Sequence, residues 1–414
     1  MPQAQNLGHM IPIGEDIYCN STPDFGNSTM EYPNRQTLMS VVEQKSIAIY
    51  YPAFLGGGAE AVALWMLEAL QQSYPLTLYT VVDVDFDRLN ALYGTHLSHK
   101  TVTVKPLFPS FLSSFVNGLI ANSKPMRMLL FHLLIRYLKQ HNDRYSLLMS
   151  AYNAMDFGKT GLQYIHWIKV LESSPFYNRI SNFSIPNMQS NLSIANSYTV
   201  ADFVKKEYGC ESTVIYPPVV MNAPDIAWEQ KQDAFICSGR LTEAKQPHKV
   251  ISILKQVRDR GFDIKLHLTG GGGGSYAWKY QNFVKKMVQE NSDWVTLYED
   301  LEYADYVQVM SNCRYGIHFK QEPFGISIAE MVKAGAIPFV RSQGGQIEIV
   351  GDQNQELLFD NEQEAVEKIV ALLSDPGLQT QLKNNLLKQK HLFSTDRFMQ
   401  EIRQVVAQYF ADRC

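Results

Sequence analysis

After residue 45 the chain alternates short apolar runs with amphipathic segments, and glycines often stand between them. The first apolar run covers residues 46–51, residues 56–58 are all glycine, and apolar residues then recur at helical spacing over 59–71. A buried strand, a glycine turn and a helix in this order open a doubly wound α/β domain. Further apolar runs predict strands at 76–82, 101–104, 146–149, 162–167 and 192–197, with a helix over 198–208.

The alternation breaks at residues 214–219, which contain Pro217 and Pro218. Proline offers no backbone N–H and is not accommodated inside a helix or a central strand, so this stretch is predicted to be a linker. A second alternation follows. Its predicted strands lie at 234–239, 264–269, 295–298, 315–319 and 337–340, and its predicted helices at 247–260, 277–290, 304–311 and 326–334.

Two α/β halves around a proline-rich linker predict two Rossmann-like, doubly wound domains. We expect an N-terminal domain over residues 45–217 and a C-terminal domain over residues 218–394. A helix within residues 395–414 is predicted to pack back on the N-terminal domain. Residues 1–44 are rich in Asn, Pro, Ser and Gly without periodicity, which predicts a poorly ordered leader.

Composition narrows the class of protein. With 45% apolar and 19% charged residues, the 414-residue chain has the balance of an ordinary globular protein, and its net charge of −4 argues against a nucleic-acid binder. No window reaches the ~18 consecutive apolar residues of a membrane span, and no basic segment followed by an apolar run marks a secretory signal. Five scattered cysteines without a C-x-x-C pair favour a reducing compartment, so we expect a cytoplasmic protein without a zinc site.

The most informative stretch has two glutamates around a turn-forming sequence, Glu322-Pro-Phe-Gly-Ile-Ser-Ile-Ala-Glu330. A predicted strand ends just before it, so Glu322 is expected at the carboxyl end of a strand, where open α/β sheets bind ligands. A helix is expected to begin near Ile326, and the N–H groups of Gly325, Ile326 and Ser327 would face an anion there. Glu330, one turn into that helix, can accept two hydrogen bonds and suits the diol of a nucleotide ribose.

Three further patterns are candidates for binding. Arg240 and Lys245 follow a predicted strand and could both reach one diphosphate, Arg as a planar fork and Lys as a point charge. Gly57 and Gly58 allow a bound group to approach the backbone closely. His166 lies at the end of a predicted strand. Taken singly, each pattern also has a plain structural interpretation, namely solvated surface charges, a tight turn and a structural histidine.

The order of these patterns resembles glycosyltransferase family 4, the retaining enzymes with the GT-B fold. The likeness covers about residues 46–410 and includes a Tyr-Pro-Pro linker at 216–218, Gly-Arg-Leu-x3-Lys at 239–245 and Glu-x-Phe-Gly-Ile-x3-Glu at 322–330. A weaker likeness points to the mannosyltransferases that extend dolichol-linked oligosaccharides, through Gly-Gly-Gly-Ala-Glu at 56–60, Tyr-Ile-His at 164–166 and Gly-Ile-His at 316–318. The resemblance implies a GT-B fold, with two Rossmann-like domains facing a cleft, and hexosyltransferase activity.

The resemblance also implies a role for each matching residue. The diphosphate of the donor would be held by Arg240 and Lys245, and its ribose by Glu330. The hydroxyls of the transferred sugar would meet Glu322 and, from the N-terminal domain, His166. The remaining donor contacts would come from the backbone of Phe324, Gly325, Ile326 and Ser327, from Gly57 and Gly58, and from Tyr298 beside the base.

The implied reaction transfers a hexose, with mannose as one candidate, from a nucleotide-diphosphate sugar to a glycan or lipid-linked acceptor. Positive groups would stabilise the nucleoside diphosphate as it leaves, so no metal or other cofactor is expected. Two alternatives stay open. One is a GT-B sugar-nucleotide epimerase, which would need further acid and base groups at the anomeric centre. The other is a non-catalytic protein that keeps only the nucleotide-sugar site.

Residues 110–139 hold many large apolar side chains, interrupted by Lys124, Arg127, Arg136 and Lys139. One interpretation is a helix pair buried in the N-terminal domain. The other is a peripheral contact with a lipid interface. Such a contact would suit an enzyme that acts at the cytoplasmic face of a membrane on a lipid-linked acceptor.

Overall fold

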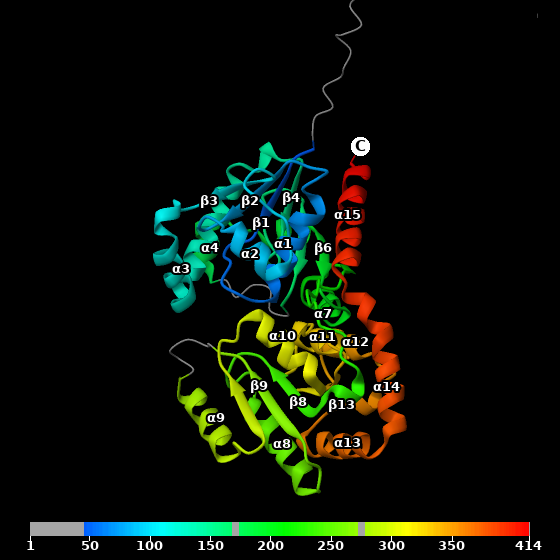
Figure 1. The fold of residues 1–414 in the computed structure, drawn as a ribbon. Helices are drawn as coiled ribbons and strands as arrows, with labels where there is room; N and C mark the ends of the chain where they lie inside the picture. Colours follow the sequence, from blue (N-terminus) through cyan, green and yellow to red (C-terminus); the bar gives the residue numbers. More distant parts are fainter. Residues whose placement is uncertain (1–44, 168–173, 272–277, 414) are drawn as a thin grey trace, which may run out of the picture. The chain divides into compact units, whose positions relative to one another are not determined.

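The computed structural model describes residues 45–167, 174–271 and 278–413 (Figure 1). The leader predicted for residues 1–44 lies outside these described residues. Two parallel β-sheets organise the described chain, one from residues 47–214, called the first half here, and one from residues 232–359, called the second half. The prediction of an α/β chain with two Rossmann-like, doubly wound sheets is confirmed.

The first sheet has seven parallel strands in the order β3-β2-β1-β4-β5-β6-β7. The strand order reverses between β1 and β4, as it does in doubly wound sheets. The strands are β1 (Ile47–Tyr50), β2 (Leu76–Thr80), β3 (Val102–Pro106), β4 (Leu147–Ser150), β5 (Leu162–Ile165), β6 (Leu192–Ala195) and β7 (Ser212–Val214).

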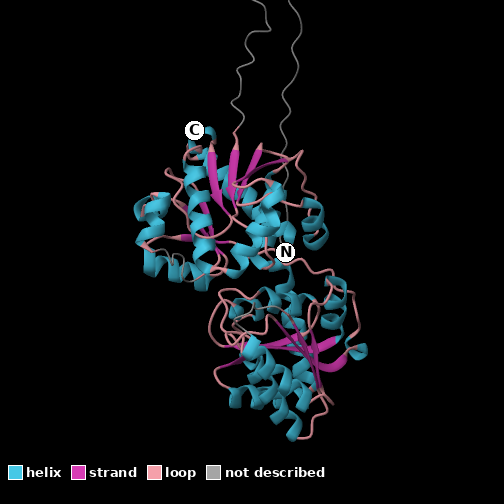
Figure 2. Ribbon diagram, turned by 90° about the vertical axis from the view of Figure 1, so that its left-hand side faces the viewer, coloured by secondary structure: helices cyan, strands magenta, loops and turns pink. Residues whose placement is uncertain are grey.

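Both faces of the first sheet are buried. On one face Ile47 and Ile49 of β1 pack with Leu64, and on the other Ala48 packs with Leu134. This two-sided burial is the reason for the continuous apolar runs of the strands, and Figure 2 shows the helices on either side. The helices of this half are α1 (Gly58–Leu70), α2 (Phe86–Tyr93), α3 (Ser113–Asn122), α4 (Lys124–Lys139), α5 (Pro175–Ser181), α6 (Ile185–Gln189) and α7 (Tyr198–Tyr208), with 3-10 turns η1 (Ser110–Leu112) and η2 (Asn142–Arg144).

The helix pair predicted within residues 110–139 is present as α3 and α4. Leu134 and Leu138 of α4 are fully buried against the first sheet, so the pair does contribute to the core. Phe111 and Phe115, in contrast, are 83% and 68% exposed. None of the described helices is long and apolar enough to cross a membrane.

The second sheet has six parallel strands in the order β10-β9-β8-β11-β12-β13. Its order reverses between β8 and β11, and ligands of doubly wound sheets bind beyond the carboxyl ends of the strands at such a reversal. The strands are β8 (Gln232–Ser238), β9 (Lys265–Thr269), β10 (Val295–Tyr298), β11 (Cys313–His318), β12 (Ile337–Arg341) and β13 (Leu358–Phe359).

Helices also cover both faces of the second sheet. Phe235 of β8 faces the cluster that contains Val250 and Ile369, whereas Ile236 faces the cluster that contains Met310 and Met331. The helices are α8 (Pro247–Asp259), α9 (Trp278–Glu290), α10 (Tyr303–Asn312), α11 (Ile326–Lys333), α12 (Gln346–Val350), α13 (Glu362–Ser374) and α14 (Pro376–Gln389), with 3-10 turns η3 (Trp228–Gln230), η5 (Gln355–Leu357) and η6 (Lys390–Phe393).

The last helix, α15 (Thr395–Ala411), packs with the first sheet. Its Phe398 and Ile402 belong to the same buried cluster as Ile47 of β1, and α15 contacts α1. The Tyr409 hydroxyl donates to the Thr160 carbonyl at 3.0 Å. The chain therefore returns to the first half after it has completed the second.

Most predicted elements are present with ends shifted by one or two residues, and α7 has the predicted bounds. The elements that were not predicted are mostly short or weakly patterned. β7 has three residues and β13 has two, too few for a periodicity. In the longer α14, only Leu382 and Leu386 are buried, so its sequence is polar on most sides.

We predict that Ile402→Ala destabilises the protein, because it empties a fully buried position between α15 and the first sheet. The free energy of unfolding should fall by about 2–4 kcal/mol, measured by urea titration. The matched control is Gln404→Ala on the exposed face of the same helix, which should leave the unfolding midpoint unchanged. Equal effects of the two substitutions would contradict the packing described for α15.

Candidate active site

The candidate residues of the second half meet at the carboxyl ends of its two central strands. β8 ends at Ser238 and continues into the loop of Arg240 and Lys245, whereas β11 ends at His318 and continues to Glu322. The Lys245 Nζ atom lies 2.6 Å from Glu322 Oε1 although the two residues are far apart in sequence. They come together because parallel strands end at the same edge of a sheet.

Glu322 is a buried carboxylate with three positively polarised neighbours. Its Oε1 atom accepts hydrogen bonds from Lys245 Nζ at 2.6 Å and from His318 Nε2 at 3.1 Å. Its Oε2 atom accepts from Lys320 Nζ at 3.0 Å. A buried charge is tolerated only when charges and hydrogen bonds compensate it, and these three do so. The alternative interpretation of Glu322, a solvated residue on a surface loop, does not describe this geometry.

The charge state of this group follows from its contacts. Burial alone would raise the pKa of Glu322, but the hydrogen bond from His318 and the charge of Lys245 outweigh it and hold the pKa well below its usual range. An ionised carboxylate only accepts hydrogen bonds, so His318 donates through Nε2. Burial also lowers the pKa of His318, so the ring is neutral and Nδ1 is an acceptor. That Nδ1 atom is buried and has no hydrogen-bond partner in the described chain.

The backbone around Glu322 is held as firmly as its side chain. The N–H of Glu322 donates to the side-chain oxygen of Gln346 at 2.7 Å, and its carbonyl accepts from the N–H of Gly345 at 2.9 Å. The next aromatic residue, Phe324, is buried and packs against the rings of Tyr216 and Phe393. These contacts together fix the position of the loop.

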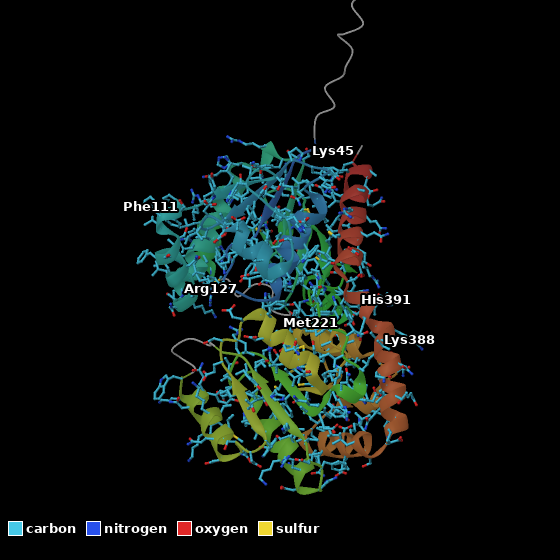
Figure 3. The ribbon with its side chains drawn as sticks, viewed as in Figure 1. Lys45, Phe111, Arg127, Met221, Lys388 and His391 are labelled. Carbon is cyan, nitrogen blue, oxygen red and sulfur yellow. The ribbon has the colours of Figure 1, made fainter. Side chains whose placement is uncertain are left out.

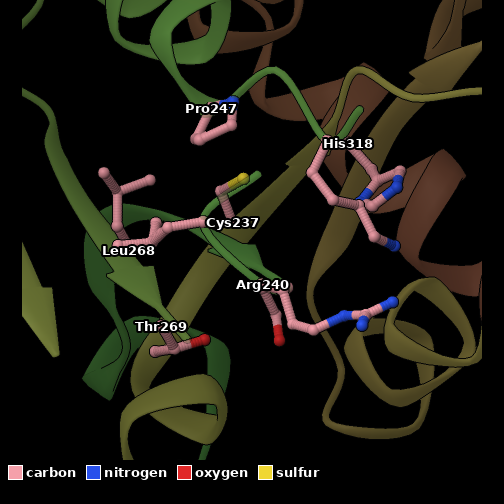
Figure 4. A pocket seen from close by; sticks show the side chains of 10 residues that line it. Cys237, Arg240, Pro247, Leu268, Thr269 and His318 are labelled. Carbon is pink, nitrogen blue, oxygen red and sulfur yellow. The ribbon is translucent and has the colours of Figure 1, made fainter. Parts of the chain in front are cut away.

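A pocket opens beside this cluster, between the ends of β8, β9 and β11 (Figure 4). Gly239, Arg240, Lys245 and His318 are among the residues that line it. Arg240 is exposed, and its guanidinium has no hydrogen-bond or ion-pair partner among the described residues. The pocket is thus lined by one cation paired with Glu322 and one that has no partner in the described chain, an arrangement that favours an anionic ligand.

Helix α11 begins beside Glu322 with Gly325 as its N-cap at a φ of 111°, a conformation that favours glycine. The first helical bond runs from the Ile328 N–H to the Gly325 carbonyl at 2.9 Å. The N–H groups of Gly325, Ile326 and Ser327 precede it and have no acceptor among the described residues. They form the positive end of the helix, as predicted for an anion site.

Glu330 lies one turn further along α11 and is half-buried. Its Oε2 atom accepts a hydrogen bond from the Tyr306 hydroxyl at 2.7 Å, and that hydroxyl lies 3.0 Å from Ser238 Oγ. Burial raises the pKa of Glu330 to about 7, although the bond from Tyr306 and the charge of Lys333 oppose the rise. The two glutamates of one motif therefore have opposite electrostatic surroundings.

Tyr298 ends β10 on the same sheet, but among the described residues no hydrogen bond or ring contact joins its side chain to the Glu322 cluster. Its hydroxyl lies 3.4 Å from the Nδ1 atom of His267, in the middle of β9. The ring is therefore turned back along the sheet. Its predicted place beside the base stays a prediction.

His166 follows β5 in the first half and is buried. Its Nε2 atom lies 2.9 Å from the Ala151 carbonyl, and its backbone N–H donates to Asn153 Oδ1 at 2.8 Å. A carbonyl only accepts, so Nε2 carries the proton and Nδ1 is an acceptor, without a hydrogen-bond partner among the described residues. Burial lowers the pKa of His166 to about 4, so the ring is neutral near pH 7.

The glycine turn before α1 is stabilised by the side chain of Glu60, which lies in the first turn of that helix. Gly57 has a φ of 137° and caps the helix, and the buried Glu60 accepts a hydrogen bond from the N–H of Gly56. The Tyr93 hydroxyl donates to the second oxygen of Glu60 at 2.9 Å. A side chain at Gly58 would overlap that of Ile326, so the structure brings the predicted residues Gly58 and Ile326 into contact.

Four residues of this site were not predicted as site residues, namely His318, Lys320, Gln346 and Tyr306. His318 and Lys320 closely precede Glu322 in sequence, so their proximity was a usable signal. Gln346 and Tyr306 reach the two glutamates from other helices, and no spacing in the sequence indicates those contacts.

Comparison with known proteins supports the predicted resemblance. Residues 222–389 match the family model of glycosyl transferases group 1. A search of curated proteins finds no match. Among solved structures, HepE of Anabaena in complex with UDP-glucose aligns over 88% of this chain and 100% of its own, with a TM-score of 0.64 at 17% identity.

Two further solved structures have the same fold. Sucrose-phosphate synthase from Thermosynechococcus elongatus aligns over 89% of this chain and 100% of its own, with a TM-score of 0.63 at 16% identity. WaaG, a glycosyltransferase involved in lipopolysaccharide biosynthesis, aligns over 84% of this chain and 95% of its own, with a TM-score of 0.57 at 13% identity. The predicted GT-B fold is thereby confirmed.

We predict that Glu330→Gln stabilises the folded protein, and more so at high pH. A folded-state pKa of about 7, above an unfolded value of about 4.3, means that wild-type stability falls as pH rises between these values. Glutamine keeps the acceptor for Tyr306 but has no charge to bury. The difference in free energy of unfolding should grow from near zero at pH 4.5 to roughly 3 kcal/mol at pH 8.

Urea titrations of both proteins between pH 4.5 and 8 measure this difference. Glu290→Gln, at an exposed position of α9, is the control and should show little pH-dependent change. A Glu330→Gln difference that is flat across this range would show that Glu330 is not the group that titrates.

Proposed function

Because residues 222–389 match the family model of glycosyl transferases group 1, we propose that this chain is a retaining glycosyltransferase that moves a hexose from a nucleotide-diphosphate sugar to a glycan or lipid-linked acceptor. The observation that carries the proposal is the cluster in which Lys245, His318 and Lys320 surround the buried Glu322. Beside it lies Arg240, whose guanidinium has no partner among the described residues.

The diphosphate of the donor is assigned to Arg240, Lys245 and the N-terminus of α11. Arg240 has no partner among the described residues and lines the same pocket as Lys245. As the bond between sugar and diphosphate breaks, negative charge develops on the leaving oxygen, and these groups stabilise it without rearrangement. The proposal therefore assigns this stabilisation to protein cations and helix N–H groups, with no metal or other cofactor.

The transferred sugar is assigned to Glu322. Lys245, His318 and Lys320 already occupy three acceptor positions of its two oxygens. When a diphosphate draws Lys245 away, Oε1 gains an acceptor position for a sugar hydroxyl. His318 and Lys320 keep the carboxylate ionised and oriented during this exchange. Diphosphate binding thus prepares Glu322 for the sugar.

His166 is assigned to the donor sugar as a neutral hydrogen-bond acceptor. Its Nε2 proton is committed to the Ala151 carbonyl, so Nδ1 is the atom that can meet a sugar hydroxyl. With a pKa of about 4 it does not carry a proton near pH 7. We assign no protein nucleophile, and retention follows from attack by the acceptor hydroxyl on the face that the diphosphate leaves.

The nucleotide end of the donor is assigned to Glu330, which would accept hydrogen bonds from the ribose diol, with the base toward Tyr298. The solved structures of HepE with UDP and with UDP-glucose support a nucleotide sugar as the donor class. The base and the sugar of this donor can be identified by measuring how fast the protein hydrolyses different UDP-, GDP- and ADP-sugars without acceptor.

The two alternative functions differ in their products. An epimerase would convert a nucleotide sugar into its epimer or into a free sugar and nucleotide without an acceptor. A non-catalytic binding protein would leave every nucleotide sugar intact. The presence of Arg240, Lys245, Glu322 and Glu330 in one connected site favours transfer over a binding site that has lost its chemistry.

A lipid-linked acceptor would place the enzyme at a membrane surface, at its cytoplasmic face. The surface that suits this contact is formed by η1, α3 and the start of α4. It exposes Phe111 and Phe115 and carries Lys124 and Arg127, so it combines aromatic rings with positive charge (Figure 3). Anionic lipid is the occupant that matches both features.

We predict that Lys245→Ala or Arg240→Ala abolishes sugar transfer while the protein stays folded, because each removes a cation from the leaving group. A loss of about 10²–10³-fold in turnover is expected for each. Purified variants are assayed with the donor identified by the screen, and circular dichroism checks their fold. Lys255→Ala, an exposed lysine of α8 paired with Asp259, is the control and should keep wild-type turnover. Near-normal turnover in either active-site variant would overturn the assignment.

We predict that the protein floats with anionic liposomes and that replacing Phe111 and Phe115 together by serine reduces this binding by about tenfold or more. Each exposed ring contributes roughly 1.5–3 kcal/mol when it enters an apolar phase. Leu387→Ser removes a similarly exposed apolar side chain from α14 and should leave flotation unchanged. If the wild-type protein stays at the bottom of the gradient with anionic liposomes, the membrane contact is wrong, whatever the outcome of the transfer assays.

A further inference from the structure

One hydroxyl in the second half connects the two parts of the proposed donor site. Tyr306, on α10, donates to Glu330 Oε2 at 2.7 Å and lies 3.0 Å from Ser238 Oγ. Ser238 ends β8 and directly precedes the loop of Gly239 and Arg240. The ribose group and the diphosphate loop are therefore joined through a single tyrosine.

The direction of these hydrogen bonds follows from their chemistry. A tyrosine hydroxyl has one proton, and Tyr306 gives it to the carboxylate of Glu330. Ser238 must then be the donor to Tyr306. The result is a chain of three groups, Ser238 to Tyr306 to Glu330, in which each hydroxyl is oriented by the next acceptor.

This series of hydrogen bonds uses only one of the two carboxylate oxygens of Glu330. Among the described residues Oε2 accepts the hydrogen bond from Tyr306, whereas Oε1 has no hydrogen-bond partner. With Oε2 held by Tyr306, the carboxylate has a fixed orientation and presents Oε1 to a ligand. The neighbouring Tyr303 points elsewhere, because its hydroxyl donates to the Val220 carbonyl at 2.5 Å.

We propose that Tyr306 is a positioning residue for the nucleotide, which orients Glu330 toward the ribose hydroxyls and links that contact to the loop of Arg240. The proposal rests on the proposed function, because it assumes a nucleotide donor. It adds to that function a residue that never touches the ligand and acts through Glu330.

The position of Tyr306 also makes nucleotide binding depend on pH. The titratable groups around Glu330 are Tyr303 and Tyr306 on α10 and Lys333 on α11. Burial raises the pKa of Glu330 to about 7, and the bond from Tyr306 opposes that rise. Because the ionised carboxylate is the better acceptor, affinity should increase as pH rises through about 7. Without the Tyr306 hydroxyl the pKa rises further, so the increase moves to higher pH.

Titration calorimetry tests the proposal. UDP, GDP and ADP are each titrated into the wild-type protein, and the tightest of them is then compared with its 2′,3′-dideoxy form between pH 6 and 9. Tyr306→Phe should weaken the ribonucleotide about tenfold and shift its pH profile upward. It should change the affinity for the dideoxy form less than about twofold, because no ribose hydroxyl is then present to meet Glu330. Both forms carry the same phosphates, so the pH profile of the dideoxy form shows how much of the pH dependence comes from phosphate ionisation.

Two further variants complete the experiment. Tyr303→Phe removes a hydroxyl from the same helix without touching Glu330, and should leave both affinities unchanged. Ser238→Ala breaks the chain at its other end, and should weaken the ribonucleotide in the same direction as Tyr306→Phe but by less. In steady-state assays Tyr306→Phe should raise the KM for the donor and leave kcat nearly unchanged.

The outcomes separate this inference from the function it rests on. If the wild-type protein binds none of the three nucleotides, the proposed function fails. If it binds one of them and Tyr306→Phe binds equally well with the same pH profile, only the inference fails. An equal loss for the ribonucleotide and its dideoxy form would show that Tyr306 merely supports the fold, and would also overturn the inference.

Discussion

The buried charge of Glu322 is the constraint on which the rest of the site depends. A carboxylate without any compensation would cost several kcal/mol in this position, and the surrounding groups together offset that cost. Lys245 comes from the loop after β8, and His318 and Lys320 come from the end of β11. The hydrogen bond from Glu322 to Gln346 adds α12. Three separate segments, the loop after β8, the end of β11 and α12, thus meet at this one residue, and their arrangement forms the proposed donor site.

The same motif contains a second carboxylate whose surroundings act in the opposite direction. Glu322 has cations on both oxygens and a lowered pKa, whereas Glu330 has a tyrosine hydroxyl on one oxygen and a pKa near 7. Pairs of similar groups whose environments separate their pKa values often have separate roles. Here the ionised partner faces the charged pocket, and the less acidic partner lies next to α10, where a nucleotide would present only neutral hydroxyls.

Sequence alone predicted the parts of this protein that depend on local patterns. Continuous apolar runs located most strands of both sheets because both faces of each sheet are buried, and the loop that carries Glu322 was placed correctly at the end of β11. Contacts between segments that are distant in sequence were harder to predict. Lys320 was near enough in sequence to be considered, but the bond from Tyr306 to Glu330 depends on how α10 packs against α11. The partners of His166 and Tyr298 were likewise set by packing on neighbouring strands.

The short ion pair between Lys245 and Glu322 has a consequence for ligand choice. Lys245 is paired with Glu322, so any anion that binds this lysine must compete with an internal carboxylate. A single weak acid or a stray phosphate gains little from that exchange, because it replaces one carboxylate contact by another of similar strength. In the proposed function a ligand with two phosphates would engage Lys245, Arg240 and the start of α11 together, and would so displace the glutamate. In the proposed function Glu322 would therefore compete with small anions for Lys245, and the site would favour a diphosphate over a single phosphate or carboxylate.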